Sequence, residues 1–269
     1  MVLVDGHVHV HECFDVARLF DAAAANFATA ARTLAGAREY DAVLCLVESR
    51  AERFLDTVRA RRDRVWRGGH GYWEIEPTCE LETLVVRRGG TRLTLIAGRQ
   101  IVTRERLEVL ALGTTASLPD GEPIEATLAA VSDAGAAAVL PWGVGKWLGA
   151  RGAVVARILA AREWRHVLLG DNGNRLELGP EPAEFAAARR SGRAVLPGSD
   201  PLPLRGEEAR VGAYGFAVDV ALDPLRPAAA LLALLKSDAA FVVFGRRQPL
   251  ARFVGNQVAL KLTSLRRSA

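Results

Sequence analysis

Two histidines near the start of the chain, His7 and His9, are the residues whose types and spacing most directly suggest chemistry. They close an apolar run that begins at Val2, and the alternation around them has the two-residue period of an extended strand. Side chains at positions i and i+2 of a strand point to the same face. Two neutral imidazoles held side by side by rigid backbone suit a divalent transition metal. The pattern predicts a metal site at the end of the first strand, although His-x-His also occurs as the polar end of an edge strand.

A third histidine, His11, continues the same spacing. Cys13, Phe14 and Asp15 follow it, and from there the apolar residues recur with a helical period. We therefore expect His11 at the rim of the site or beside a ligand, rather than as a third ligand.

The composition indicates a globular chain with one sizeable core. Of its 269 residues, half are apolar and a quarter are charged, which suits one large α/β domain over 1–269. The 35 basic and 31 acidic residues are largely interleaved, without the clustered basic and aromatic residues of a nucleic-acid surface. We therefore expect no nucleic-acid partner and a mild preference for small anionic ligands. The sequence does not define an oligomeric state.

Cysteine content and apolar run lengths bear on the compartment. The three cysteines, Cys13, Cys45 and Cys79, have no paired short spacing, which favours a reducing compartment over a disulfide scaffold. The sequence shows no secretory signal pattern, and its apolar runs are shorter than a membrane span. We therefore expect a cytoplasmic protein with no membrane partner.

The apolar periodicity predicts strands alternating with helices over most of the chain. Helices are expected at 14–34, 51–62, 123–134, 154–161 and 182–190, and strands at 40–47, 136–140, 167–170 and 194–196. Further elements at 214–222, 227–236, 241–244 and 252–262 complete the alternation. Between about 66 and 114 the pattern changes to short strands at 73–76, 84–86, 92–98 and 107–112, with Gly89 and Gly90 in a hairpin turn. The predicted fold is an α/β, distorted TIM-like (β/α) barrel with a small strand-rich insertion.

Polar residues follow several of the late strands. In βα barrels the carboxyl ends of the strands build the active site. The residues expected there are Lys146, Asp171, Asn172, Asn174, Ser199 and Asp200. The run from Asp171 to Asn174 fits a ligand-binding loop and equally an ordinary turn, since turns use the same residue types.

Four segments together resemble the polymerase-and-histidinol-phosphatase (PHP) superfamily of metal-dependent hydrolases. Val4–His9 resembles the first motif, whose two histidines bind metal. Gly98–Gly113 resembles the segment that carries a metal-bridging glutamate and then a histidine. Val139–Gly143 falls where a His-Pro pair is usual, and Pro197–Pro201 resembles the late Gly-Ser-Asp-x-His motif. The resemblance implies a TIM-like barrel that performs metal-dependent hydrolysis.

The chain departs from the PHP pattern at four expected ligand positions, which hold Gln100, Glu108, Leu140 and Pro201. These departures exclude a complete trinuclear site. The resemblance then implies a reduced centre with His7, His9 and Asp200, and with Glu108 and Asp171 as candidate carboxylate substitutes. Such a donor set suits Zn²⁺, Mn²⁺ or Fe²⁺ and leaves a position open for water.

The amidohydrolase superfamily is a second, related resemblance. There, too, His-x-His ends the first strand, and the aspartate of a Gly-Ser-Asp-Pro-like run ends the eighth. This reading makes Asp200 both a ligand and the general base, and Phe253–Ala259 resembles the terminal helix of that group. Against it, His166 precedes its strand, so no histidine remains for strands five and six.

The expected mechanism is attack by a metal-activated water on phosphorus or a carbonyl carbon. Asp200 is the candidate to orient that water or accept its proton. Lys146, Arg205 and Arg210 are candidates to bind an anionic group, although each also fits an ordinary solvated charge. Three functions follow. They are a hydrolase of phosphate esters or other small anionic substrates, an amidohydrolase-like enzyme cleaving C–N or C–C bonds, and a catalytically inactive barrel serving as a binding or scaffold protein.

Overall fold

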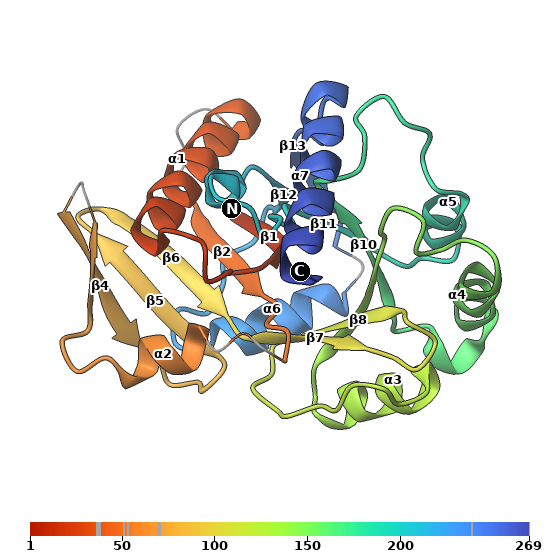
Figure 1. The fold of residues 1–269 in the computed structure, drawn as a ribbon. Coiled ribbons are helices and arrows are strands. Elements are labelled where there is room, and N and C mark those ends of the chain that lie inside the picture. Colours follow the sequence, from red (N-terminus) through yellow and green to blue (C-terminus); the bar gives the residue numbers. More distant parts are fainter. Residues whose placement is uncertain (36–38, 51, 53, 69–70, 238, 269) are drawn as a thin grey trace.

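The computed structural model describes residues 1–35, 39–50, 52, 54–68, 71–237 and 239–268, and its strands form two mixed sheets (Figure 1). The eight-stranded sheet has the order β13 (Val242–Gly245), β12 (Tyr214–Val218), β1 (Val2–Val8), β2 (Asp41–Leu46), β6 (Thr91–Ile96), β5 (Thr83–Arg88), β4 (Gly71–Pro77) and β3 (Val65–Gly68). The five-stranded sheet has the order β11 (Val195–Gly198), β10 (Leu168–Asn172), β9 (Ala137–Pro141), β8 (Glu108–Leu112) and β7 (Gly98–Val102).

The predicted TIM-like barrel is wrong. A TIM barrel closes eight parallel strands into one sheet, whereas here β12 runs antiparallel to β1, and β8 runs antiparallel to both β7 and β9. The segment 66–114 is not an insertion, because β6 pairs in parallel with β2 inside the larger sheet while β7 and β8 belong to the smaller sheet. An apolar run looks the same in the sequence whether its strand lies in a closed barrel or in an open mixed sheet.

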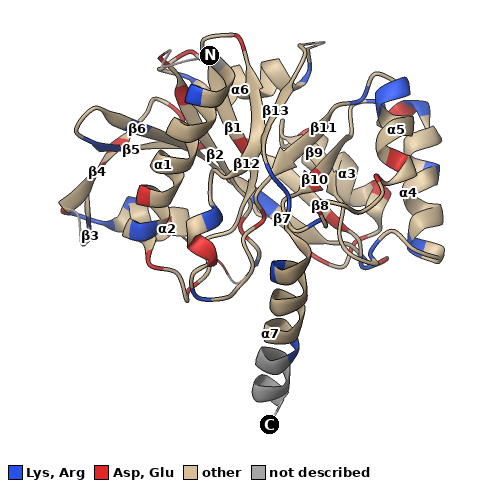
Figure 2. Cartoon of the chain, turned by 90° about the horizontal axis from the view of Figure 1, so that it is seen from above, with Lys and Arg blue, Asp and Glu red and all other residues tan. Residues whose placement is uncertain are grey.

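Helices cover both sheets, and the expected helices are present with shifted ends. They are α1 (Val16–Ala35), α2 (Phe54–Ala60), α3 (Ile124–Asp133), α4 (Ala150–Ala160), α5 (Ala183–Arg190), α6 (Pro227–Leu235) and α7 (Leu250–Ser268), with short 3-10 helices at Arg162–Trp164 and Glu207–Arg210. Ala51 and Arg53, within the predicted helix 51–62, lie outside the described residues. The first turns of α7 point away from both sheets (Figure 2). Among the described residues, no helix is long and apolar enough to cross a membrane.

Strand β1 is the central element of the core. All seven of its residues are buried, and its apolar side chains are divided between two core clusters. Leu3 packs with Phe20 of α1, whereas Val2 and Val4 pack with Phe216 of β12 on the other side. Because β1 is buried on both faces, the residues at its carboxyl end are held rigidly.

The two sheets lie close together at Gly198, the last residue of β11. A Cβ atom on Gly198 would lie 2.5 Å from the Cβ of His7, far inside van der Waals contact. Just beyond it, the backbone N–H of Asp200 donates to the carbonyl oxygen of His7 at 2.8 Å. Only glycine therefore lets β11 lie against β1 at this point.

Replacing Gly198 with alanine is expected to lower the free energy of unfolding by about 1–3 kcal/mol, because the added methyl group forces two packed backbones apart. Urea denaturation followed by circular dichroism measures this change. Gly90→Ala is the matched control, since a Cβ there meets no atom within 4 Å. Equal stability of the two variants would show that the close approach imposes no constraint.

Candidate metal centre

Three side chains meet at the carboxyl ends of β1 and β11, namely His7, His9 and Asp200. The two Nε2 atoms lie 3.2 Å apart, and Oδ1 of Asp200 lies 3.4 Å from Nε2 of His7 and 3.9 Å from Nε2 of His9. Ligand atoms bound to a tetrahedral ion at about 2.1 Å are about 3.4 Å from one another. The three atoms are therefore spaced to bind one metal ion.

The environment favours the metal-binding protonation states of His7 and Asp200. Burial lowers the pKa of His7 to about 4, against the opposing charge of Asp200. Burial would by itself raise the pKa of Asp200, but its electrostatic interactions with His7 and then with His9 outweigh this effect and leave that pKa lowered. A neutral imidazole and an ionised carboxylate are the forms that bind metal.

The backbone of Asp200 is held in an unusual conformation. Its φ angle is 46°, in the left-handed region that non-glycine residues seldom occupy. Asn174 donates from Nδ2 to the carbonyl oxygen of Asp200, and the N–H of Asp200 is bonded to His7. Strain of this kind concentrates at functional sites. Asn174, expected from sequence near the site, thus positions Asp200.

Asp5 links β1 by hydrogen bonds to the segment that carries Asp200. Its buried carboxylate accepts hydrogen bonds from the backbone N–H groups of Ser199 and Gly212, each at 2.8 Å. Burial raises the pKa of Asp5 to about 6, although these hydrogen bonds favour the ionised form. Ser199, also expected near the site, contributes through its backbone at this contact.

Glu52 is the site residue that sequence reasoning missed. It follows β2, and its Oε2 lies 3.2 Å from Nδ1 of His9, while Oε1 lies 2.9 Å from Nδ1 of His11. Burial acts to raise the pKa of Glu52, but hydrogen bonds from His11 and His9 hold it well below the usual range. Burial likewise acts to lower the pKa of His9, and the bond to Glu52 outweighs it and raises that pKa. An acidic residue placed just after a predicted strand neighbouring β1 was the available signal.

The Glu52 contact has the form of a carboxylate that orients a metal-binding histidine. With Nε2 of His9 directed at the ion position, Nδ1–H donates to Glu52, which fixes the tautomer and the ring. His11 joins this arrangement through Glu52, and its Nε2 lies 3.1 Å from the carbonyl oxygen of Pro201. The structure thus places His11 beside the three-residue group, in the second cluster of His9, His11 and Glu52.

Replacing Glu52 with glutamine is expected to weaken metal binding by about 10- to 100-fold, because His9 loses its charged hydrogen-bond partner. Competition with a chromophoric chelator measures the affinity. Glu12→Gln, the same change at an exposed residue of the same cleft, is expected to bind metal as the wild type does. Unchanged metal affinity in both variants would show that Glu52 does not contribute to the metal centre.

Gln100 of β7 brings a fourth oxygen to the group from the smaller sheet. Its Oε1 lies 3.2 Å from Nε2 of His9. An amide oxygen is neutral and is a weaker donor than the glutamate expected at this position by resemblance. The site therefore has one carboxylate, from Asp200, at the position between the two histidines.

Two predicted ligands have other partners. Glu108 forms an ion pair with Lys146. Asp171 is bound at both oxygens by Arg175, at 2.8 Å each, and also accepts from the hydroxyl of Tyr214 at 2.7 Å. Neither carboxylate belongs to the potential metal-binding groups found among the described residues. Of the five predicted ligands, the structure brings together His7, His9 and Asp200.

The remaining predicted residues divide between the cleft and the protein interior. An open cleft of about 1010 Å³ is lined by His9, Asp200 and Arg205, whose side chain is exposed. Arg210 is buried and donates to Oδ1 of Asn174 and to the carbonyl oxygen of Gly173, each at 2.7 Å. Asn172 likewise donates to a backbone carbonyl, that of Trp142. Arg205 is thus the predicted cation that lines the cleft.

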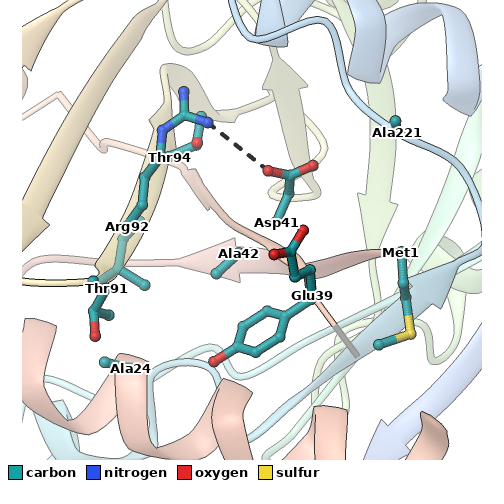
Figure 3. Close-up of a pocket in the computed structure, with 12 residues that line it drawn as sticks. Met1, Ala24, Glu39, Asp41, Ala42, Thr91, Arg92, Thr94 and Ala221 are labelled. Carbon is teal, nitrogen blue, oxygen red and sulfur yellow. Dashed lines mark ion pairs between the residues drawn. The ribbon is translucent and has the colours of Figure 1, made fainter. Parts of the chain in front are cut away.

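A second pocket, of about 580 Å³, lies where β1, β2 and β6 begin (Figure 3). Its side chains include Asp41 and Arg92, which form an ion pair at 3.8 Å, with Glu39 nearby. The histidine group lies at the other ends of β1 and β2. The metal-binding chemistry is therefore separate from this pocket.

Comparison with known proteins bears on the fold. No protein-family model matches the chain, and no curated protein matches it. Among solved structures, the crystal structure of PsfC from Pseudomonas syringae PB-5123 is similar, with a TM-score of 0.58. The match covers 97% of this chain and 98% of that chain at 16% sequence identity. At this identity the likeness shows a shared fold alone.

Proposed function

We propose that this chain is a metal-dependent hydrolase with a one-ion centre, acting on a phosphate ester or another small anionic substrate. The observation that carries the proposal is the group of His7, His9 and Asp200, whose ligand atoms lie 3.2–3.9 Å apart beside an open cleft. The resemblance of the surrounding segments to PHP motifs supports the same reading.

The donor set fits the proposed ion. Two imidazoles with one carboxylate form a set that zinc hydrolases use, and the same ligands also suit Fe²⁺ and Mn²⁺. Such an ion, when bound, lowers the pKa of a coordinated water and so supplies hydroxide near neutral pH. Gln100 and Glu52 complete the surroundings of His9, one by an amide oxygen and the other by a charged hydrogen bond.

Three side chains of the site have separate roles in the proposed reaction. Asp200 is partly exposed at the cleft, and its ionised carboxylate is suited to orient a water and accept its proton. Glu52 keeps the ring of His9 in place. Arg205, at the exposed side of the cleft, is suited to bind a phosphate or carboxylate group of the substrate.

The test is hydrolysis by the metal-loaded chain against two panels, one of phosphate esters and one of amides and lactones. We expect phosphate-ester hydrolysis that stops on chelation and returns when metal is restored. Amide or lactone hydrolysis instead would favour the amidohydrolase-like function. Metal binding without turnover on either panel would favour a binding or scaffold role, and failure to bind metal would overturn the proposal.

A further inference from the structure

Helix α7 presents an uncovered apolar face beyond the two sheets. Leu250, Val254 and Val258 are 61%, 52% and 53% exposed. Their spacing of four residues places them in one row along the helix. Figure 2 shows this part of the helix extending away from the body of the molecule. Within the described part of the chain, this row remains open to solvent.

The same segment carries the formal net charge of the whole chain. Residues 250–269 contain the basic residues Arg252, Lys261, Arg266 and Arg267, and no aspartate or glutamate. The chain has 35 basic and 31 acidic residues, so the part before 250 has equal numbers of each. The charge is thus concentrated in the helix that also exposes apolar side chains.

We propose that α7 docks in the interface of an anionic lipid membrane. An amphipathic helix with basic residues and no acidic ones binds such a surface by placing its apolar row among the acyl chains and its charges near the head groups. This differs from the sequence-based expectation of no membrane partner, which rested on the missing secretory signal pattern and on the length of apolar runs. A helix that lies on a membrane needs no span.

Charge favours a membrane over a second copy of the chain. Pairing α7 with α7 across a twofold axis would bring two segments of the same positive charge together. The remainder of the chain has no net negative charge to offset that repulsion. An anionic bilayer satisfies both the apolar row and the charge.

The base of α7 is attached to the segment that follows Asp200. Buried Glu207 accepts hydrogen bonds at Oε1 from Arg252, at 2.8 Å, and from Asn256, at 3.4 Å. Gln248, just before the helix, donates to Oδ1 of Asn174, the residue that holds Asp200. A membrane-bound α7 would therefore hold the cleft close to the lipid surface. The docking itself does not depend on the proposed hydrolase activity.

The test is co-sedimentation of the full chain with vesicles of phosphatidylcholine alone and of equal parts phosphatidylcholine and phosphatidylglycerol. We expect at least about tenfold stronger binding to the anionic vesicles, weakened by added salt. Val254→Ser/Val258→Ser should weaken it roughly tenfold, because the apolar row is lost. Arg266→Gln/Arg267→Gln should weaken it roughly 25-fold, since each basic residue strengthens binding by roughly fivefold.

Leu81→Ser is the matched control, because Leu81 is 74% exposed in the connection between β4 and β5 and its replacement should leave vesicle binding unchanged. Equal binding to both vesicle types, no binding at low salt, or binding that survives the α7 substitutions would overturn the proposal. Sedimentation velocity without lipid provides a further test. A dimer that dissociates in Val254→Ser/Val258→Ser would assign the face to a second copy of the chain and would also overturn the proposal.

Discussion

The double variant His7→Ala/His9→Ala is expected to lose tight binding of Zn²⁺, Mn²⁺ and Fe²⁺, whereas the wild-type chain should bind close to one ion. Of the described donors nearest the two Nε2 atoms, the substitutions leave the carboxylate of Asp200 and the amide oxygen of Gln100. Structural zinc sites with four ligands bind with about 10–16 kcal/mol, so losing two ligands should cost at least about a thousandfold in affinity. Plasma mass spectrometry after incubation with each metal and gel filtration measures the bound ion.

Glu108→Gln provides the comparison for that experiment. Glu108 was a predicted ligand, yet its carboxylate is paired with Lys146 and lies outside the histidine group. We expect its metal content to equal that of the wild type. Metal retained by the double variant would place the ion elsewhere, and loss in Glu108→Gln would add Glu108 to the centre. Circular dichroism of each variant separates loss of ligands from loss of fold.

The local parts of the centre could be predicted from sequence because their signals are local. His7 and His9 are two residues apart at the end of an apolar run. This pattern predicts that their side chains share one face and lie at the end of a strand. Asp200 follows β11 in the same way. Since the carboxyl ends of β1 and β11 lie together, residues distant in sequence meet there.

The role of Glu52 could not be predicted from the sequence, because it depends on a contact between two loops. Glu52 lies in a segment that the apolar pattern assigned to a helix, which begins instead at Phe54. Its partner His9 is 43 residues away in the chain. Periodicity reports burial along one element and carries no information on which loop packs against which.

The prediction of the fold class was wrong for a related reason. The alternation of apolar strands and helices was largely correct, but strand direction and neighbours are long-range properties. β12 and β13 form an antiparallel pair beside β1, and β7 pairs antiparallel with β8, so strands that look alike in sequence build two sheets. At Gly198, β11 of the smaller sheet packs closely against β1 of the larger sheet. The two strands nevertheless belong to separate sheets, whereas the strands of a barrel form one closed sheet.

The carboxylate of Asp171 is expected to stabilise the fold rather than bind the ion. Arg175, only 4% exposed at its side chain, depends on Asp171 for two hydrogen bonds, and its Nη1 has no hydrogen-bond partner. Burial, followed by the charge of Asp171, raises the pKa of Tyr214 well above its usual range, so its hydroxyl stays protonated and donates to Asp171. Removing Asp171 would leave a buried guanidinium without its counter-charge.

Asp171→Ala is therefore expected to lower the free energy of unfolding by about 3–5 kcal/mol, the cost of breaking a buried ion pair at one partner. Its metal content should equal that of the wild type. The double variant Asp171→Leu/Arg175→Met should recover most of the loss, since apolar residues of similar volume often replace a buried pair at little cost. Glu181→Ala, which breaks an exposed bidentate pair with Arg189, should cost no more than about 1 kcal/mol. Urea denaturation and metal analysis of the same variants test this prediction. An Asp171→Ala protein that is as stable as the wild type but has lost its metal would show that Asp171 is a metal ligand.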